Sequence, residues 1–296
     1  MDVLKKCNLC QRNCLVNRYQ ELGFCKQSNE LRIAKSTLTY FEEPCISNTK
    51  GSGTIFFSGC NMGCIFCQNE KITKENYGAY LTPNRLSEIM LELQDKGAIN
   101  INLVTPTPHI IGIKEAIIKA KEKGLTIPII YNTGTYENIE SIKLLDGLID
   151  VYLPDLKYYD DKYAIKYSNS KNYFKNATEV ISEMYKQVGI CKFDEKGNII
   201  KGVIVRHLML PTLLNDSKQI IKYLYETYHD NIYISIMNQY TVIKPLKYQE
   251  LNYKVKEKDY DNLILFAINL GVKNAYCQLD NTQSTDFIPN FDLEGV

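Results

Sequence analysis

The chain has 296 residues, with 35 Lys and Arg against 34 Asp and Glu, and a formal charge of +1 at pH 7. Hydrophobic residues make up 45% and charged residues 23%, which is typical of a folded soluble chain. The near-zero charge gives no general attraction to polyanions, so no nucleic-acid partner is implied. There is no signal peptide and no apolar run of the roughly 18 residues that a membrane span requires, so we expect a cytoplasmic protein without a membrane partner.

Cysteine is concentrated near the amino terminus, where eight of the ten cysteines lie within the first 67 residues. In a reducing compartment such thiols bind metals or take part in chemistry instead of forming disulfides. Residues 1–50 show little periodicity and are rich in Cys, Asn and Gln. We therefore predict a loop-rich, Cys-rich extension over 1–50 that a bound metal holds together.

From Gly51 on, short apolar runs typical of strands alternate with amphipathic stretches typical of helices. The predicted strands are 54–58, 100–105, 127–132, 149–153, 203–210 and 232–237. The predicted helices are 83–96, 111–123, 136–145, 176–188, 217–228 and 258–270. This alternation indicates a parallel sheet with right-handed crossovers over 51–279, either an open doubly wound sheet or an incomplete barrel. Residues 280–296 are predicted to form a weakly ordered tail.

The most specific pattern is Cys60-Asn-Met-Gly-Cys64-Ile-Phe-Cys67, directly after the strand predicted at 54–58. Three thiolates this close together can converge on one soft metal centre, and cysteine ligation is what iron–sulfur clusters use. A cluster of four irons would keep one iron open for a ligand from outside the protein. The alternatives are a zinc knuckle that lacks one ligand and a buried cysteine cluster. No His lies near this loop to complete a zinc site.

The loop 59–69 resembles the signature of the radical S-adenosylmethionine superfamily, including the aromatic Phe66 before the last cysteine. The longer run 51–69 is similar to the branch named after pyruvate formate-lyase activating enzymes. Further blocks match in the same order, and the likeness covers about residues 7–277. These blocks are NINLVTPT at 100–107, YNT at 131–133, DLKY at 155–158, RHLMLP at 206–211 and MNQY at 237–240.

The resemblance implies an α/β fold, a partial (β/α)6 barrel of the TIM type, with the reactive site at the carboxyl-end mouth. It implies that Cys60, Cys64 and Cys67 hold a [4Fe-4S] cluster whose open iron binds S-adenosyl-L-methionine. An electron from a donor such as flavodoxin or ferredoxin then cleaves the sulfonium. The resulting 5′-deoxyadenosyl radical abstracts a hydrogen from the substrate, while the protein orients the cofactor and excludes water.

Strand alternation, read together with the matching blocks, predicts residues around the cofactor. Asn102 shares the inward face of its strand with Asn100 and Val104, so it needs a hydrogen-bond partner in the cofactor or in a polar core network. Asn132 ends a strand and either faces adenosine or forms a turn. The pair Asp155 and Lys157 matches the Asp-x-Lys of glycyl-radical activating enzymes, with an ordinary salt bridge at the rim as the alternative.

The stretch 105–108 stands where activating enzymes carry Gly-Gly-Glu-Pro, which holds the methionine amino group. The acidic residue is absent here, so the Thr105 hydroxyl or backbone carbonyls would replace it. Arg206 projects inward from an apolar strand, where a guanidinium is costly without an anion. Its planar fork suits the carboxylate of S-adenosylmethionine. His207 points the opposite way and is predicted to be a core histidine with its hydrogen bonds satisfied.

A second array, Cys7-x2-Cys10-x3-Cys14-x10-Cys25, lies in the extension. Four thiolates at these spacings can close a tetrahedral site, which predicts structural Zn²⁺ or an auxiliary iron–sulfur cluster, with free thiols as the alternative. A metal would supply folding energy that this segment otherwise lacks. Activating enzymes with extra clusters carry them after the radical motif, whereas this array precedes it.

Three functions follow as hypotheses. The first is an enzyme that activates a glycyl-radical protein, and the second is an enzyme that modifies a peptide or small metabolite by radical chemistry. The third is a non-catalytic iron–sulfur or zinc-binding protein. The combination of cysteine loop, Asp-x-Lys and inward Arg206 disfavours the third, because a mere metal binder needs no carboxylate clamp. A six-unit barrel has a wide mouth, which favours a protein or peptide substrate.

Overall fold

The structure is a computed structural model that describes residues 2–278, 283–284 and 288–296. Its strands form one curved sheet in the order β10-β9-β8-β6-β5-β4-β2-β1-β3, and β7 pairs with β8. The strands are β1 (Leu31–Thr39), β2 (Ser52–Phe57), β3 (Ala79–Leu81), β4 (Ile101–Val104), β5 (Ile129–Thr133), β6 (Val151–Pro154), β7 (Lys192–Phe193), β8 (Ile199–Leu208), β9 (Tyr233–Met237) and β10 (Ala275–Cys277).

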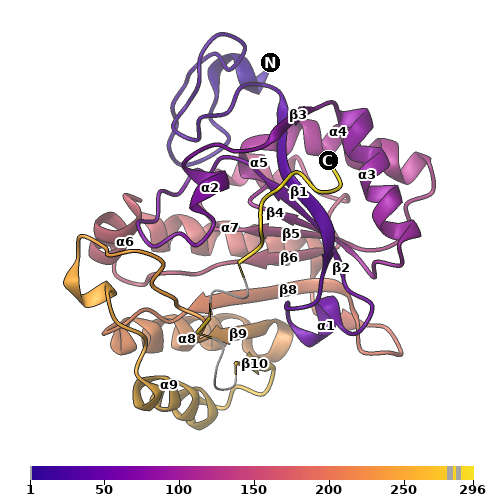
Figure 1. Ribbon diagram of the computed structural model, residues 1–296. Coiled ribbons are helices and arrows are strands. Elements are labelled where there is room, and N and C mark those ends of the chain that lie inside the picture. The colour runs from indigo at the N-terminus through magenta and orange to yellow at the C-terminus, as the bar shows by residue number, and fades with distance from the viewer. Residues whose placement is uncertain (1, 279–282, 285–287) are drawn as a thin grey trace.

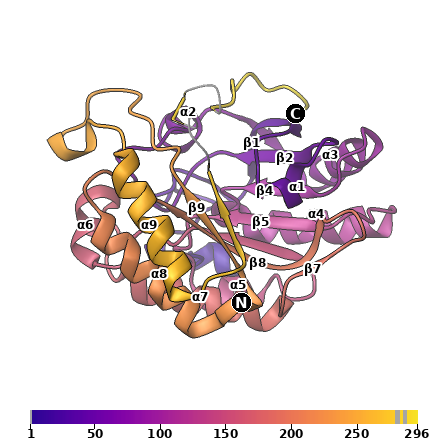
Figure 2. The ribbon, with the colours of Figure 1, turned by 90° about the horizontal axis from the view of Figure 1, so that it is seen from below.

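The helices are α1 (Pro44–Ser47), α2 (Glu70–Thr73), α3 (Pro83–Asp95), α4 (Ile110–Glu122), α5 (Ile139–Lys143), α6 (Asp161–Ser168), α7 (Tyr173–Val188), α8 (Leu214–Tyr228) and α9 (Glu257–Leu270). The longer helices α3, α4, α7, α8 and α9 follow strands and cover the outer face of the sheet (Figures 1 and 2). Short 3-10 helices occur at Val3–Lys6, Thr107–His109, His229–Asn231 and Gln249–Leu251. None of the helices in the described residues is long and apolar enough to cross a membrane.

The central strands β2, β4, β5, β6, β8, β9 and β10 run parallel. Among the described residues β10 and β3 end the sheet without pairing with each other, so the barrel is open on one side. The predicted partial α/β barrel is therefore confirmed. Parallel strands joined by helical crossovers bring all their carboxyl ends to one edge, and that edge is where sites form in such folds.

Helix α3 shows how the local sequence produces these elements. The Thr82 hydroxyl accepts a hydrogen bond from the Arg85 N–H at 3.2 Å, and Pro83 occupies the first helical position. Both features favour a helix start. The helix buries one apolar stripe against the sheet, formed by Leu86, Ile89, Met90 and Leu93, as the periodicity predicts.

Alternation along β4 places its side chains as expected. Ile101 and Leu103 are fully buried in the core that packs against the helices. Val104 lies in a separate cluster with Phe56 of β2, on the inner face of the sheet. Asn102, between them in sequence, is also fully buried on the inner face. A polar side chain in that position must find a partner inside the barrel.

The amino-terminal extension contains more regular structure than its composition suggested. Residues 31–39 form strand β1, which pairs antiparallel with β2 in a register that places Thr37 opposite Thr54. The chain then turns into α1, whose Cys45 and Ile46 are buried in one cluster with inner-face residues of β5, β6 and β8. The loop-rich prediction holds for 7–30 and is wrong for 31–39, because the strand there carries Lys, Ser and Thr and has no regular alternation of apolar and polar residues.

The carboxyl-terminal segment also differs from the predicted weakly ordered tail. Phe291 is buried, with its ring 5.5 Å from that of Phe56. The Leu293 N–H donates to the Ala34 carbonyl at 3.1 Å, and Lys35 forms ion pairs with Asp292 and Glu294. Residues 291–296 therefore continue the edge of β1. The predicted boundary at 279–280 lies outside the described residues.

Candidate cluster-binding site

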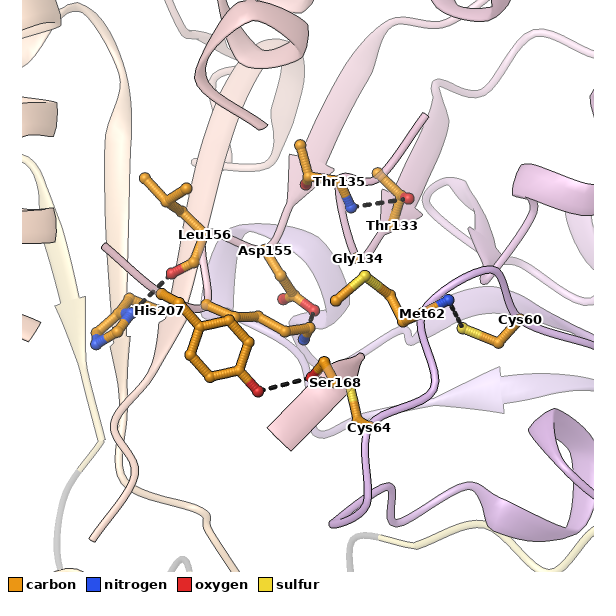
Figure 3. A network of polar contacts seen from close by, with 12 residues as sticks. Cys60, Met62, Cys64, Thr133, Gly134, Thr135, Asp155, Leu156, Ser168 and His207 are labelled. Atoms are coloured by element: carbon orange, nitrogen blue, oxygen red, sulfur yellow. Dashed lines mark hydrogen bonds and ion pairs between the residues drawn. The ribbon is translucent and has the colours of Figure 1, made fainter. Parts of the chain in front are cut away.

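The cysteine loop lies at the carboxyl edge of the sheet, next to the ends of β5 and β6 (Figure 3). It leaves β2 through Ser58 and Gly59, and Gly59 has a φ of +80°. A Cβ on Gly59 would lie 2.6 Å from the Cys25 carbonyl oxygen, so only glycine fits there. The loop therefore packs directly against the cysteine-rich extension.

Each thiol of the loop has a hydrogen-bonding neighbour. The Met62 N–H donates to Cys60 Sγ at 3.4 Å, and the Ser168 hydroxyl donates to Cys64 Sγ at 2.9 Å (Figure 3). Cys67 Sγ lies 3.3 Å from Thr73 Oγ1. Donors at sulfur stabilise thiolates and tune the clusters that thiolates hold.

Burial is the main cause that raises the pKa of the Cys60 thiol, and the neighbouring thiols of Cys64 and Cys67 raise it further. Burial also raises the pKa of Cys64, against the opposing effect of the Lys157 ammonium. These thiols are therefore protonated without a metal, and a metal centre must displace their protons.

In the parts of the chain that the structure describes, no three His, Cys, Asp or Glu side chains are arranged to hold a metal ion. Cysteines around a cubane cluster bind different irons, so they stand farther apart than the ligands of one ion. Three half-buried cysteines from one loop, each with a hydrogen-bonding neighbour, form a donor set that fits a cluster with one iron left open.

Asp155 and Lys157 follow β6 and form an ion pair with each other. Asp155 lies between Gly134 and the Cys64–Ser168 pair (Figure 3). Burial lowers the pKa of Lys157, but the Asp155 carboxylate outweighs it and raises that pKa above the ordinary value. Lys157 is therefore a charged ammonium beside the cysteine loop.

Three further predicted residues surround the same edge. The Thr105 N–H donates to the Asn132 carbonyl at 3.0 Å, which joins the ends of β4 and β5. Thr105 has a φ of +60°, a costly conformation for a β-branched residue and one found mostly where the surroundings require it. The Phe66 ring packs on Tyr240 after β9, with 5.9 Å between ring centroids. Thr105 and Asn132 thus lie at the edge that holds the cysteine loop, and Phe66, within the loop, packs toward the segment after β9.

Arg206 and Asn102 both point inside the barrel, but their partners are carboxylates of this chain. Arg206 Nε donates to Glu43 Oε1 at 2.9 Å, and its Nη2 contacts both Glu42 and Glu43. Asn102 Nδ2 donates to Glu42 Oε1 at 3.2 Å, whereas its buried Oδ1 has no partner among the described residues. The predicted free guanidinium is therefore already matched by anions.

The pKa of Glu43 supports the pairing of Arg206 with carboxylates of this chain. Burial alone would raise the pKa of Glu43, but the Arg206 guanidinium outweighs burial and lowers it below the ordinary range. Glu43 is therefore ionised, and the pair is a buried ion pair. Strand alternation could not reveal this arrangement, because both glutamates come from the turn between β1 and α1, outside the repeating units.

Two buried groups complete the surroundings. His207 Nδ1 lies 2.8 Å from the Leu156 carbonyl oxygen, as expected of a core histidine, although its Nε2 has no partner among the described residues. Burial lowers the pKa of His207 to about 4. Glu137 was not predicted; it is fully buried, accepts hydrogen bonds from the Thr107 and Thr133 hydroxyls, and has its pKa raised by burial. The two threonines that follow β4 and end β5 are the sequence signal for it.

The cysteines of the extension lie in one turn-rich segment. The Leu15 N–H donates to the Cys7 carbonyl at 2.9 Å, and the Phe24 N–H donates to Cys14 Sγ at 3.4 Å. Burial, with smaller contributions from the thiols of Cys25, Cys14 and Cys7, raises the pKa of Cys10 to about 12. These four thiols are near one another, without the spacing of ligands on a single ion.

The profile of the Radical SAM superfamily matches residues 54–232, from β2 to the start of β9. The chain belongs to the radical SAM superfamily. Membership implies a [4Fe-4S] cluster and S-adenosylmethionine as cofactors, and makes the chain a radical S-adenosylmethionine enzyme.

Two relatives and one solved structure extend this result. The uncharacterized protein MJ0674 of Methanocaldococcus jannaschii is 29% identical over 285 residues, 93% of this chain and 78% of the relative. MJ1227 of the same organism, provisionally named a glycyl-radical enzyme activating enzyme, is 29% identical over 170 residues, 56% of this chain and 65% of the relative. SuiB of Streptococcus suis bound to its precursor peptide SuiA has a TM-score of 0.51 and 14% identity, over 75% of this chain and 47% of SuiB. That last likeness concerns the fold alone.

Proposed function

We propose that this radical SAM protein holds its cluster through Cys60, Cys64 and Cys67 and uses it to generate a radical that removes a hydrogen atom from a protein or peptide. The position of the cysteine loop carries the proposal. Three half-buried cysteines lie at the carboxyl edge of a parallel barrel, next to a charged lysine. This edge is where barrel enzymes assemble their sites.

When bound, the cluster supplies the electron that splits the sulfonium of S-adenosylmethionine, and the protein supplies binding and orientation. The Lys157 ammonium, kept charged by Asp155, would attract the carboxylate of S-adenosylmethionine. Thr105 and Asn132, joined by their backbone hydrogen bond, would border the nucleoside, with Phe66 packed behind the loop. In this assignment Arg206 and Asn102 belong to the floor of the barrel rather than to the carboxylate clamp.

The substrate that we favour is a glycyl-radical protein. The name of MJ1227 supports this choice, and so does the pair Asp155 and Lys157. A sheet whose end strands do not pair among the described residues would let a chain segment from a partner approach its open side. Flavodoxin or ferredoxin would supply the electron. Cys7, Cys10, Cys14 and Cys25 lie near one another without the spacing of ligands on a single ion, so they would hold an auxiliary cluster, or would move closer together to hold Zn²⁺.

Anaerobic reconstitution with iron and sulfide tests the proposal. We expect the reduced protein to show a cluster EPR signal that changes when S-adenosylmethionine is added. Cys64→Ala should abolish that change, whereas Cys277→Ala, at an exposed cysteine of β10, should retain it. An unaltered spectral change in Cys64→Ala would overturn the ligand assignment.

Metal analysis of the same preparations tests the extension. We expect a further equivalent of zinc or iron that remains in Cys64→Ala and is lost in Cys10→Ser. If the protein purified without oxygen contains no such equivalent, the four cysteines of the extension are ordinary thiols.

A further inference from the structure

Arg12 reaches from the cysteine-rich extension into the cluster-binding loop. Its Nε donates to the Asn61 carbonyl at 2.7 Å, and its Nη2 donates to the Met62 carbonyl. The same guanidinium donates to the Asn169 carbonyl at 2.5 Å and to the Ser168 carbonyl at 3.3 Å, at the end of α6. One side chain thus joins three segments that are far apart in sequence.

The hydrogen bond to Asn61 acts directly on the cysteine loop. The Asn61 carbonyl and the Met62 N–H belong to one planar peptide group, so fixing the carbonyl fixes the direction of the N–H. That N–H is the donor to Cys60 Sγ. Arg12 therefore determines whether Cys60 has its donor.

The bonds at the end of α6 act on a second thiol. The Ser168 carbonyl accepts a hydrogen bond from Arg12, and the Ser168 hydroxyl donates one to Cys64 Sγ. Two of the three thiols of the loop thus have donors whose positions depend on the same guanidinium.

The charge of Arg12 is not cancelled nearby. Within the described residues no carboxylate forms an ion pair with it. Its further neighbours include the Ser170 hydroxyl at 3.4 Å and the rings of Phe24 and Tyr136, whose centroids lie 3.9 and 5.1 Å from the guanidinium carbon. A positive charge and sulfur-directed donors both favour the reduced, more negative form of a bound cluster.

The extension holds Arg12 in place through its backbone. Arg12 lies between Cys10 and Cys14, in a turn closed by the Asn13 N–H and the Cys10 carbonyl at 3.0 Å. The Asn138 amide donates to the Asn8 carbonyl at 2.6 Å and to the Cys10 carbonyl at 3.2 Å. This turn is therefore anchored to the segment between β5 and α5.

We propose that Arg12 is a positioning residue for the cluster-binding loop, and that the cysteine-rich extension is the platform that presents it. The inference rests on the proposed function, since it assigns the extension a role in adjusting the cluster. Of the nitrogens in basic side chains, only a guanidinium offers a planar fork that serves several carbonyls at once.

The first experiment needs no cluster. In the metal-free protein, iodoacetamide alkylation of Cys60 and Cys64 is followed by mass spectrometry in wild type, Arg12→Gln, Arg12→Lys and the control Arg85→Gln, whose guanidinium pairs with Glu92 on α3. We expect both thiols to react roughly ten-fold faster in Arg12→Gln and Arg12→Lys, because a loop that Arg12 no longer holds opens more often to the reagent, and even one hydrogen bond to a charged group is worth about that factor. The buried Cys45 is the internal reference for an intact fold, and Arg12→Lys carries the test if Arg12→Gln exposes Cys45.

The second experiment uses the reconstituted protein. We expect Arg12→Gln to bind iron as wild type does but to shift the reduction potential of the cluster to a more negative value, while Arg85→Gln leaves it unchanged. Unchanged alkylation rates together with an unchanged reduction potential would overturn the inference. If Arg12→Lys had the alkylation rates and the potential of wild type, the positive charge of Arg12 would explain its effect, and positioning by its fork of donors would be refuted. If the wild type binds no cluster, the proposed function fails, and the alkylation rates still decide the role of Arg12.

Discussion

Replacing Glu43 by Gln measures how strongly the buried pair with Arg206 supports the barrel. The side chains of Arg206 and Glu43 are only 10% and 6% exposed, and the two share two contacts. Removing one partner of a buried pair costs about 3–5 kcal/mol, because the other charge remains buried without compensation. Glu42 still contacts the guanidinium, so we expect the lower end, about 3 kcal/mol.

Thermal unfolding of the metal-free protein, followed by circular dichroism at pH 7 with reductant, gives the readout. For a chain of this size we expect the midpoint to fall by roughly 6–12 °C. Glu226→Gln is the control, since its ion pair with Lys222 is exposed and 3.8 Å long, and no measurable change is expected. Glu42→Gln should cost less than Glu43→Gln because Glu42 is more exposed.

The pH dependence gives the sign of the effect. The folded-state pKa of Glu43 lies below its ordinary value of 4.5, so its contribution is fully present above 4.5 and is lost as the pH falls through the folded-state pKa. The difference between wild type and Glu43→Gln should therefore shrink in acid. A Glu43→Gln variant no less stable than Glu226→Gln at pH 7 would falsify the claim that this pair supports the barrel.

Glu137→Gln should make the free energy of unfolding less sensitive to pH. Burial raises the pKa of the Glu137 carboxyl, so its contribution to stability is fully present below pH 4.5 and is lost as the pH rises through its folded-state pKa. Unfolding midpoints at about pH 5 and pH 8 check this, with the exposed Glu140→Gln as control; equal pH slopes in wild type and Glu137→Gln would contradict it. Phe291→Ala should cost about 3 kcal/mol, since the ring is buried against Phe56. Leu293→Ala, in the same segment but with an exposed side chain, should be nearly neutral, and equal urea midpoints for the two variants would show that this segment is not docked.

Most of the barrel could be predicted from the sequence because its signals are local. The stripe of α3 follows from a 3.6-residue period, and the burial of Ile101 and Leu103 follows from alternation along one strand. The cysteine loop was found because three ligands fall within eight residues, and the edge on which it lies follows from the parallel connections. Such features need no knowledge of distant partners.

The remaining features depend on contacts between segments that are far apart in sequence, and neither the helical period nor strand alternation predicts such contacts. Glu42 and Glu43 stand in a turn and show no pattern, yet they neutralise Arg206, which lies more than 160 residues later. The sequence indicated that Arg206 needs an anion, and tertiary structure decided which one. Arg12 was overlooked for a related reason, since the motif around it was interpreted through its cysteines alone.

One edge of strand β1 is paired by two segments that are synthesised at very different times. β3 covers the edge of β1 at Leu31–Ile33, and residues 292–294 cover the next stretch through Lys35 and the backbone of Ala34 and Ser36. A ribosome adds Asp292 257 residues after Lys35, so this part of the edge stays bare while the rest of the barrel is made. Unpaired edges are templates for association with other chains. The nascent barrel therefore passes through a stage in which this stretch of β1 is open to pairing with other chains, and that stage ends when the 291–296 segment docks.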